Sequence, residues 1–268
     1  MHTKDITYSD GSASLLGFLA CDEKAEGKRP GILVVHEGLG LEHHAMTRAR
    51  MLAELGYVGF AADMFGDRRQ AQTVDESRGL IGPLRGDRQL LLRRARAALQ
   101  VLAELPQVDD RRLGAIGFCF GGLVVLELAR DGADLRAVVS FHGILNTTMP
   151  ARAGKIGASI LVCTGADDPL VPPQQVRAFE EEMRAANVSD WQVLTLGNTR
   201  HGFTNPAADG SIFASALYDE ASDRRSWMAM RAVFNEAFIF PVRSGRARRS
   251  EVRAPRGRSR RPWSRAGQ

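Results

Sequence analysis

The chain has 268 residues, enough for one α/β domain with a sizeable core, and its 44% hydrophobic and 25% charged content is ordinary for a globular protein. No apolar run reaches membrane-spanning length, and Met1 to Asp5 show no signal-peptide pattern. The net charge of +5 arises in residues 241–268, whose ten arginines and one glutamate give +9 and leave −4 for the other residues. That mildly acidic body gives no electrostatic reason to expect nucleic-acid or membrane partners.

The basic segment at the end of the chain differs from the rest in composition. Residues 241–268 hold almost no apolar side chains beside their arginines, which predicts a disordered tail after a folded domain over residues 1–240. The charge of this tail leaves open an association with nucleic acid or with a membrane surface.

The cysteine content is low. Cys21, Cys119 and Cys163 do not form a disulfide framework. A free thiol suits a reducing compartment, so we expect the protein in the cytoplasm.

The first third of the chain predicts a hairpin followed by a buried strand. Residues 5–29 have loosely alternating apolar positions interrupted by Asp10-Gly11, as in an edge hairpin. Residues 31–35 form a continuous apolar run, which is typical of a parallel strand covered on both faces. Next we predict a helix over 43–56 that ends at Gly56, a strand over 57–62, and an arginine-rich loop with a short helix over 67–86.

The remaining residues alternate between strand-like and helix-like patterns. Such alternation predicts a parallel sheet covered by helices. We expect strands at 113–118, 135–141, 160–163 and 192–196, and helices at 87–105, 123–130, from 172 onward and at 213–239.

The turn Gly117-Phe118-Cys119-Phe120-Gly121-Gly122 joins a predicted strand to a predicted helix. A sharp turn of this kind strains the residue at its apex, and the glycines beside that residue prevent collisions. The pattern is the G-x-S-x-G nucleophile elbow with Cys119 in place of serine, above a helix N-terminus that favours a thiolate. The alternative is a glycine-rich turn around a buried structural cysteine.

A candidate acid and a candidate histidine follow Cys119, in the order nucleophile, acid, histidine that α/β-hydrolases use. Asp167 and Asp168 come after the predicted strand 160–163, and His201 comes after 192–196. Both lie just beyond a strand, where open α/β sheets place their sites. His142 also follows a strand, but it precedes the acid in sequence, so we interpret it as structural.

With these residues the chain resembles the dienelactone hydrolase family of α/β-hydrolases over roughly residues 5–240. The resemblance implies an α/β-hydrolase fold in a single domain, with a mostly parallel central sheet and helices on both faces. It also implies hydrolysis of a small ester or lactone by Cys119, His201 and Asp168, with no cofactor or metal and with Asp167 as the rival acid. Four stretches carry it: Val35 to Gly40, Gly117 to Gly122, Gly165 to Pro172 and His201 to Phe203.

The resemblance also assigns roles to the loop after residues 31–35. The backbone N–H groups of Gly38 and Phe120 would form the oxyanion hole, where each donor contributes on the order of 3 kcal/mol. Glu37 would contact the resting thiol and help to ionise it when substrate binds, and a surface carboxylate at a strand end is the alternative. Three nearby histidines lack further metal ligands, so we expect loop and helix-start residues: His36, His43 and His44.

One departure from the family pattern concerns substrate binding. Four residues beyond the catalytic histidine, where the family's characterised enzyme has an arginine that helps to bind the substrate carboxylate, this chain has Asn205. The change argues against dienelactone itself as the substrate, unless an arginine between 68 and 85 compensates. The other interpretation of the whole chain is an inactive hydrolase fold used as a binding module, which the intact elbow, acid and histidine disfavour.

Overall fold

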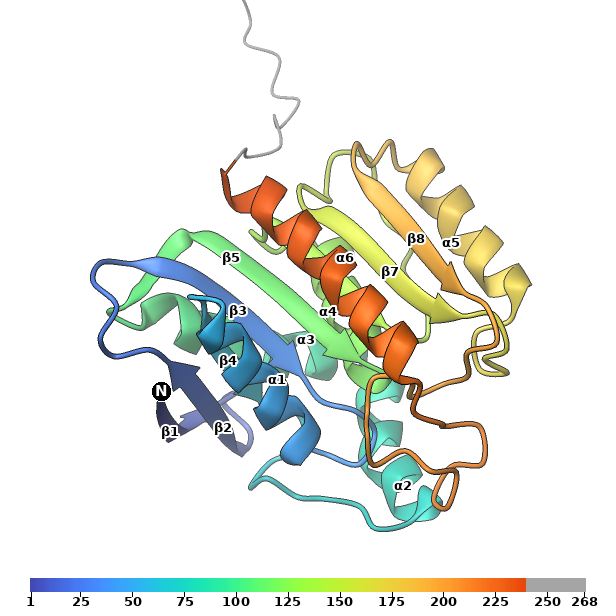
Figure 1. Cartoon of the computed structure of the whole chain (residues 1–268), viewed down its shortest axis with the longest axis horizontal. Helices are drawn as coiled ribbons and strands as arrows, with labels where there is room; N and C mark the ends of the chain where they lie inside the picture. Colours follow the sequence, from blue (N-terminus) through green and yellow to red (C-terminus); the bar gives the residue numbers. More distant parts are fainter. Residues whose placement is uncertain (240–268) are drawn as a thin grey trace, which may run out of the picture.

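The computed structural model describes residues 1–239, so the predicted tail lies outside the described residues. One sheet has the strand order β1-β2-β4-β3-β5-β6-β7-β8 (Figure 1). The strands are β1 His2–Ser9, β2 Ser14–Cys21, β3 Arg29–Val35, β4 Val58–Ala62, β5 Val108–Phe118, β6 Ala137–Phe141, β7 Ser159–Gly165 and β8 Trp191–Leu196. The helices are α1 His43–Glu54, α2 Val74–Gly86, α3 Arg88–Glu104, α4 Phe120–Arg130, α5 Pro173–Ala185 and α6 Glu220–Ile239.

The sheet is antiparallel at one edge and parallel elsewhere. β1 and β2 form a hairpin, and β2 runs antiparallel to β4. From β4 across to β8 every neighbouring pair is parallel. The predicted edge hairpin and mostly parallel sheet are therefore confirmed. Because these strands share one direction, the loops that follow β3, β5, β6, β7 and β8 meet at one edge of the sheet.

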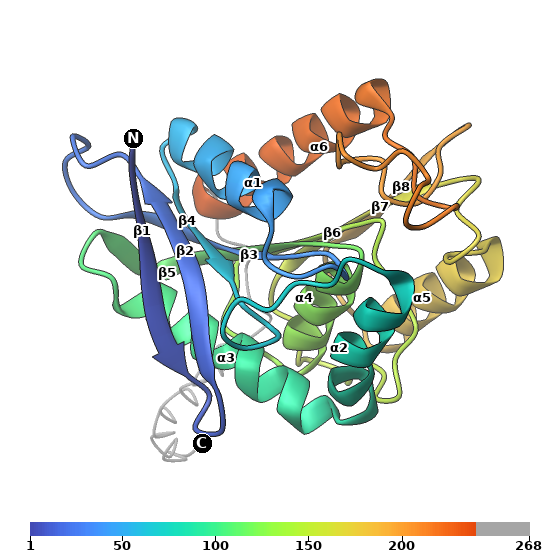
Figure 2. The same cartoon turned by 90° about the horizontal axis from the view of Figure 1, so that it is seen from below.

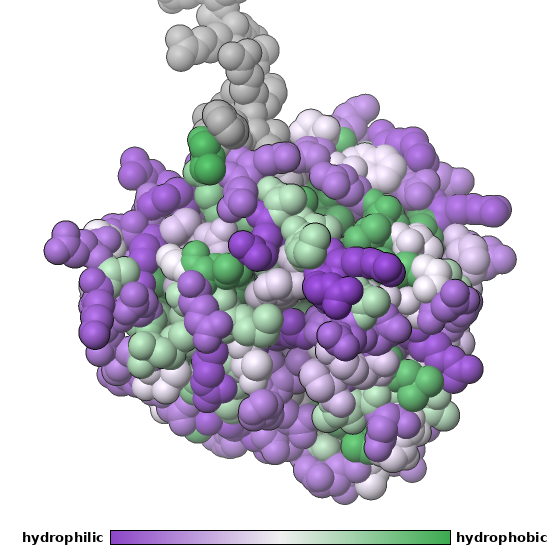
Figure 3. Space-filling view, in the orientation of Figure 1, coloured by the Kyte–Doolittle hydropathy of each residue, from purple (hydrophilic) through white to green (hydrophobic). Residues whose placement is uncertain are grey.

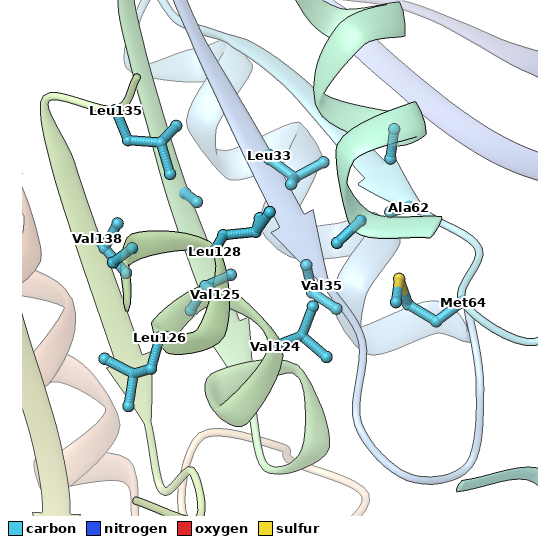
Figure 4. Packing of buried hydrophobic residues seen from close by; sticks show 14 of the residues in the cluster. Leu33, Val35, Ala62, Met64, Val124, Val125, Leu126, Leu128, Leu135 and Val138 are labelled. Carbon is cyan, nitrogen blue, oxygen red and sulfur yellow. The ribbon is translucent and has the colours of Figure 1, made fainter. Parts of the chain in front are cut away.

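Helices cover both faces of the sheet (Figure 2). α1 and α6 pack on one face through buried side chains such as Leu52 and Phe234, while α2, α3, α4 and α5 cover the other. Every residue of α4 is buried, and Val124 and Val125 lie beside Val35 of β3 (Figure 4). An apolar helix that is enclosed on all sides holds its N-terminus in a fixed position under the loop edge.

The loop with a short helix predicted over 67–86 has a longer helix than expected, because α2 runs over 13 residues from Val74 to Gly86. The sequence contains the residues that start this helix, Thr73 and Glu76. The N–H of Glu76 donates to the Thr73 hydroxyl at 3.2 Å, and the Glu76 carboxylate accepts from the N–H of Gln72 at 2.7 Å. This exchange is a capping box, which fixes the first turn of a helix.

The predicted final helix over 213–239 begins too early, because α6 starts at Glu220. The Asp219 carboxylate accepts from the N–H of Ser222 at 2.7 Å, as an N-cap does. Before it, Ala216 pairs with His201 and Leu217 with Asp209 in short bridges. A turn at residues 213–216 and these bridges therefore hold the segment before Asp219 across the loop edge, so it does not join the helix.

The surface is ordinary for a globular protein. On the face shown in Figure 3, hydrophilic side chains predominate and apolar ones form small groups between them. Within residues 1–239, no helix has both the length and the apolar character needed to cross a bilayer.

Candidate active site

Cys119 occupies the sharp turn between β5 and α4. Its φ of 52° and ψ of −111° lie in a region that side-chain-bearing residues avoid, so the turn holds the residue under strain. Two glycines make the turn possible. A Cβ on Gly117 would collide with the carbonyl of Gly121, and a Cβ on Gly121 would collide with that of Val35. The predicted strand-to-helix elbow is present, with the cysteine side chain at its apex.

Asp168 and His201 come from the loops after β7 and β8, and both are buried. Asp168 Oδ2 lies 2.8 Å from His201 Nδ1, and Oδ1 accepts from the N–H of Leu170 at 2.9 Å. Asp167, the rival acid, is exposed. The carboxylate that orients the histidine is therefore that of Asp168, and the hydrogen bond fixes the tautomer with a proton on Nδ1.

His201 and Cys119 interact through charge. Burial alone would lower the pKa of His201, but the negative charge of Cys119 and the hydrogen bond to Asp168 raise this pKa well above its usual value. His201 Nε2 is buried and forms no aligned hydrogen bond with any residue of the described 1–239 segment, the sulfur included. The arrangement leaves Nε2 free to exchange a proton during a reaction.

Glu37 follows β3 and lies in the same cavity as Cys119. Its Oε2 accepts from Asn205 Nδ2 at 2.6 Å and lies 3.3 Å from His44 Nδ1. Burial would raise the pKa of Glu37, but the charge of His44 and these contacts lower it to about 2, so the group is ionised at neutral pH. Within residues 1–239 no hydrogen bond joins this carboxylate to the Cys119 sulfur, where the family resemblance implies a contact with the resting thiol.

Arg48, which the sequence did not single out, defines the tautomer of His44. Its Nε donates to His44 Nε2 at 3.2 Å, so the proton of the neutral ring resides on Nδ1, the atom near Glu37. The 3.3 Å separation from Glu37 is not an aligned hydrogen bond, so the neutral ring acts on the carboxylate through the positive end of its Nδ1–H dipole. Arg48 is itself buried and bound to Asp223 at 2.7 Å.

His142 lies beneath the elbow. Its Nδ1 accepts the N–H of Cys119 at 3.1 Å, and its Nε2 lies 2.8 Å from the Thr204 hydroxyl. Burial and the charge of His201 put the pKa of His142 well below its usual value. The ring is thus a neutral support for the backbone of Cys119, in agreement with our interpretation of His142 as structural.

The other two histidines of the loop differ in environment. His36 is fully buried, where Nδ1 lies 2.6 Å from the carbonyl of Glu37 and Nε2 accepts the N–H of Met64 at 3.1 Å. His43 is the exposed first residue of α1. Both occupy the predicted loop and helix-start positions, and His36 holds the backbone of Glu37 in place.

The two predicted oxyanion-hole amides belong to residues that line the cavity, Gly38 and Phe120. Phe120 begins α4, where helix N–H groups lack intrahelical acceptors. The carbonyl of Gly38 accepts from the Ser77 hydroxyl of α2 at 2.7 Å, and a Cβ on Gly38 would lie 2.9 Å from that oxygen. A glycine at 38 therefore lets α2 approach the loop and fix its backbone beside the elbow.

The cavity that contains these groups has a volume of about 760 Å³. α2 forms one wall through side chains such as Ser77 and Ile81. Residues 207–216 form another wall. The apolar lining includes Leu39, Val74, Ile81, Leu123, Ile144 and Phe213, and the polar lining includes Glu37, Glu42, Arg78, Arg85, Asn205 and Asp209.

Glu42 is a second acidic side chain of this cavity, and no sequence motif identified it. Burial and the charge of Glu37 raise the pKa of Glu42 to about 7. Among residues 1–239, no side chain forms a hydrogen bond or an ion pair with it. The carboxyl therefore exchanges its proton near neutral pH inside the cavity.

Comparison with known proteins places this geometry in a family. The sequence profile of the dienelactone hydrolase family matches residues 15–238. A Caenorhabditis elegans protein of uncharacterised function is 42% identical over 147 residues, which cover 54% of this chain and 92% of that one. A Yersinia pestis protein provisionally named a carboxymethylenebutenolidase is 24% identical, covering 87% of this chain and 90% of its own.

A solved structure agrees with this assignment. The crystal structure of a dienelactone hydrolase-like promiscuous phosphotriesterase from metagenomic libraries has 46% sequence identity and a TM-score of 0.85. The match covers 88% of this chain and 98% of that one. The chain therefore belongs to the dienelactone hydrolase family and has the α/β-hydrolase fold of that family of hydrolases.

Proposed function

We propose that the protein hydrolyses a small carboxylic ester or lactone, with Cys119 as nucleophile, His201 as acid and base, and Asp168 as the group that orients His201. The observation that carries the proposal is the strained Cys119 at the elbow, next to a buried His201 that is bound to Asp168 in the same cavity. A nucleophile, a base and an acid that orients the base, held together in one site, are the requirements for covalent acyl transfer.

The reaction has two steps. The Cys119 thiolate attacks the carbonyl carbon, and the N–H groups of Gly38 and Phe120 stabilise the oxyanion that forms. His201 gives a proton to the leaving alkoxide, which departs and leaves a thioester on Cys119. Water, which gives a proton to His201, then attacks the thioester and releases the acid.

Glu37 is the proposed second base. An ionised carboxylate in a largely buried setting can accept the thiol proton when substrate approaches and pass it to His201 for the leaving alkoxide, although it is bound to Asn205 in the free protein. His201 alone is the competing base.

The test is detection of the acyl-enzyme. After rapid mixing with 4-nitrophenyl butyrate and an acid quench, peptide mass spectrometry should find a butyryl thioester on Cys119 alone. Cys119→Ala should lose the thioester and at least about 10³-fold of the turnover, while Cys163→Ala, which alters a buried thiol of β7, serves as control. Unchanged turnover in Cys119→Ala would refute the nucleophile, and no turnover of any ester by the wild type would favour the binding-module interpretation.

A second candidate is phosphotriester hydrolysis, favoured by the 46% identity to a promiscuous phosphotriesterase. The same thiolate would attack phosphorus and release an alcohol, which leaves a phosphoryl group on sulfur for water to remove. Diethyl 4-nitrophenyl phosphate tests it, because Cys119→Ala should abolish any release of 4-nitrophenol. Carboxymethylenebutenolidase activity is tested with dienelactone in the same assay. We also propose a cytoplasmic location, supported by the chemistry of a free catalytic thiol.

A further inference from the structure

The negative charge of the cavity is concentrated beside the nucleophile. Glu37 Oε1 lies 4.0 Å from His142 Nε2, and the same ring accepts the N–H of Cys119 at 3.1 Å, so one imidazole separates the carboxylate from the elbow. Glu42 is close enough to Glu37 for the charge of one to affect the other. Two carboxyl groups therefore share this end of the cavity.

The guanidinium groups of the lining form no ion pair with Glu37 or Glu42 within residues 1–239. Arg78 and Arg85 extend from α2 and are exposed, and Arg78 is paired with Asp75 at 3.1 Å. Arg48 lies close to Glu37 through His44, but it is 5% exposed and is held by Asp223. Asn205 is neutral, and its amide already donates to Glu37. Apart from His201, which serves the reaction, a carboxylate on the acyl chain of a substrate would therefore meet negative charge and, among residues 1–239, no free cation at that end.

On the basis of the proposed function, we propose that the cavity selects esters with neutral, apolar acyl chains and rejects acyl chains that carry a carboxylate, and that Glu42 sets this selection. The apolar walls supplied by Leu39, Ile81 and Phe213 favour the neutral chain. Two like charges several ångströms apart in a partly buried site repel strongly enough for a 10- to 100-fold effect, as an order of magnitude.

Glu42 can be changed without loss of a structural contact. It is the N-cap residue of α1, but its side chain makes no capping hydrogen bond. Glu42→Gln keeps the shape of the side chain and removes only the charge. Glu181→Gln is the matched control, because it removes one carboxylate from an exposed position of α5.

The experiment compares two substrates that differ by a methyl and a carboxylate, 4-nitrophenyl pentanoate and mono-4-nitrophenyl glutarate. The measured quantity is the ratio of kcat/KM for the neutral ester to that for the anionic ester. At pH 8 we expect a ratio of about 10 to 100 in the wild type, a ratio about tenfold lower in Glu42→Gln, and the wild-type ratio in Glu181→Gln.

The pH dependence of this ratio isolates Glu42 from the other charged groups around the cavity. Glu37, Asp209 and the glutarate carboxylate stay ionised between pH 6 and 8, Arg78 and Arg85 stay charged, and the pKa of His201 is raised. Cys119, His201, and His44 beside Glu37 are the same in wild type and Glu42→Gln, so the difference between their two pH profiles belongs to Glu42. Because Glu42 loses its proton near pH 7, the ratio should rise from pH 6 to pH 8 in the wild type and stay flat in Glu42→Gln.

The outcomes separate this inference from the proposed function. A ratio near one in the wild type, or one that Glu42→Gln leaves at the wild-type value, overturns the selection by charge even if Cys119 is the nucleophile. Hydrolysis of both esters that survives in Cys119→Ala overturns the proposed function instead. A ratio that falls equally in Glu181→Gln would assign the effect to net charge and would also overturn the role of Glu42.

Discussion

His201, beyond β8, and His142, beyond β6, are side by side at the loop edge of the sheet, with ring centroids 5.1 Å apart. Both are buried, yet their surroundings move their pKa values in opposite directions. Burial opposes a charge on each ring, but Cys119 and Asp168 raise the pKa of His201. His142 faces a backbone N–H and a hydroxyl, and the charge of His201 adds to burial, so its pKa is lowered.

The comparison shows that partners, more than burial, decide which imidazole can carry a proton. A carboxylate at 2.8 Å makes His201 suited to proton transfer. A neutral ring with its Nδ1 lone pair on the N–H of Cys119 instead fixes the strained elbow. The proposed function thus assigns chemistry to one imidazole and support to the other, a few ångströms apart.

The largest expected effect comes from exchanging each ring for an amide. His201→Asn removes the proton-transfer group and should lower kcat/KM for 4-nitrophenyl butyrate by about 10⁴-fold. His142→Asn keeps an acceptor near the N–H of Cys119 and should cost about tenfold or less. Circular dichroism shows whether each variant is folded. Equal losses in two folded variants would contradict the division of roles.

Glu37 provides the next test, because it asks whether His201 is a sufficient base. Glu37→Gln keeps the shape and the hydrogen bond with Asn205 possible but removes the charge. We expect acylation to slow by about 10²-fold, within the range of one general base, and deacylation to change much less. Single-turnover kinetics with a chromogenic ester separate the two steps. If acylation keeps its wild-type rate, His201 is the only base and Glu37 is a strand-end carboxylate.

A smaller effect is expected when Glu37 keeps its charge but loses its amide partner. Asn205→Ala removes a hydrogen bond that helps to hold the pKa of Glu37 at about 2, so this pKa should rise toward its ordinary value. A base must be ionised to act, and the acid limb of the acylation rate should therefore move to higher pH by up to about one unit. The pre-steady-state burst, measured after rapid pH jumps to values between about pH 2 and 5, would detect it. An acid limb at the wild-type position would mean that His44 alone sets the charge of Glu37.

Local patterns in the sequence predict the elbow, the acid and the catalytic histidine. Gly117 and Gly121 flank Cys119 directly, and Asp168 and His201 each follow an apolar run, so a few neighbouring residues contain the signal. The parallel sheet is predictable for the same reason. The first turn of α2 was also present as Thr73 and Glu76, but the arginines around it suggested a loop.

The groups that tune the site were not predictable, because their partners are distant in the chain. Glu37 meets Asn205 across 168 residues, and Arg48 meets Asp223 across 175. The protonation of Glu42 depends on how deeply the folded cavity buries it and on the charge of Glu37, neither of which a sequence pattern contains. The turn and bridges at residues 213–217 likewise depend on pairing with the loop after β8.

The last test measures how His142 and His201 change the pH dependence of the free energy of unfolding. The pKa of His142 is lowered in the folded state. Below the unfolded pKa of about 6.5, the unfolded chain therefore binds a proton at this ring that the folded protein does not bind. Its contribution is therefore present above pH 6.5 and is lost as the pH falls, by at most about 1.4 kcal/mol per pH unit. The raised pKa of His201 acts in the opposite sense, since its contribution is complete below pH 6.5 and is lost as the pH rises through the folded pKa.

Urea unfolding between pH 5 and 7.5 measures both contributions. As the pH falls, the free-energy difference between wild type and His142→Asn should shrink, and the difference between wild type and His201→Asn should grow. His36, which is also buried with a lowered pKa, affects all three proteins alike and cancels in both differences. If the two differences change in the same direction, the rings share one protonation behaviour, and the contrast in their partners does not explain their roles.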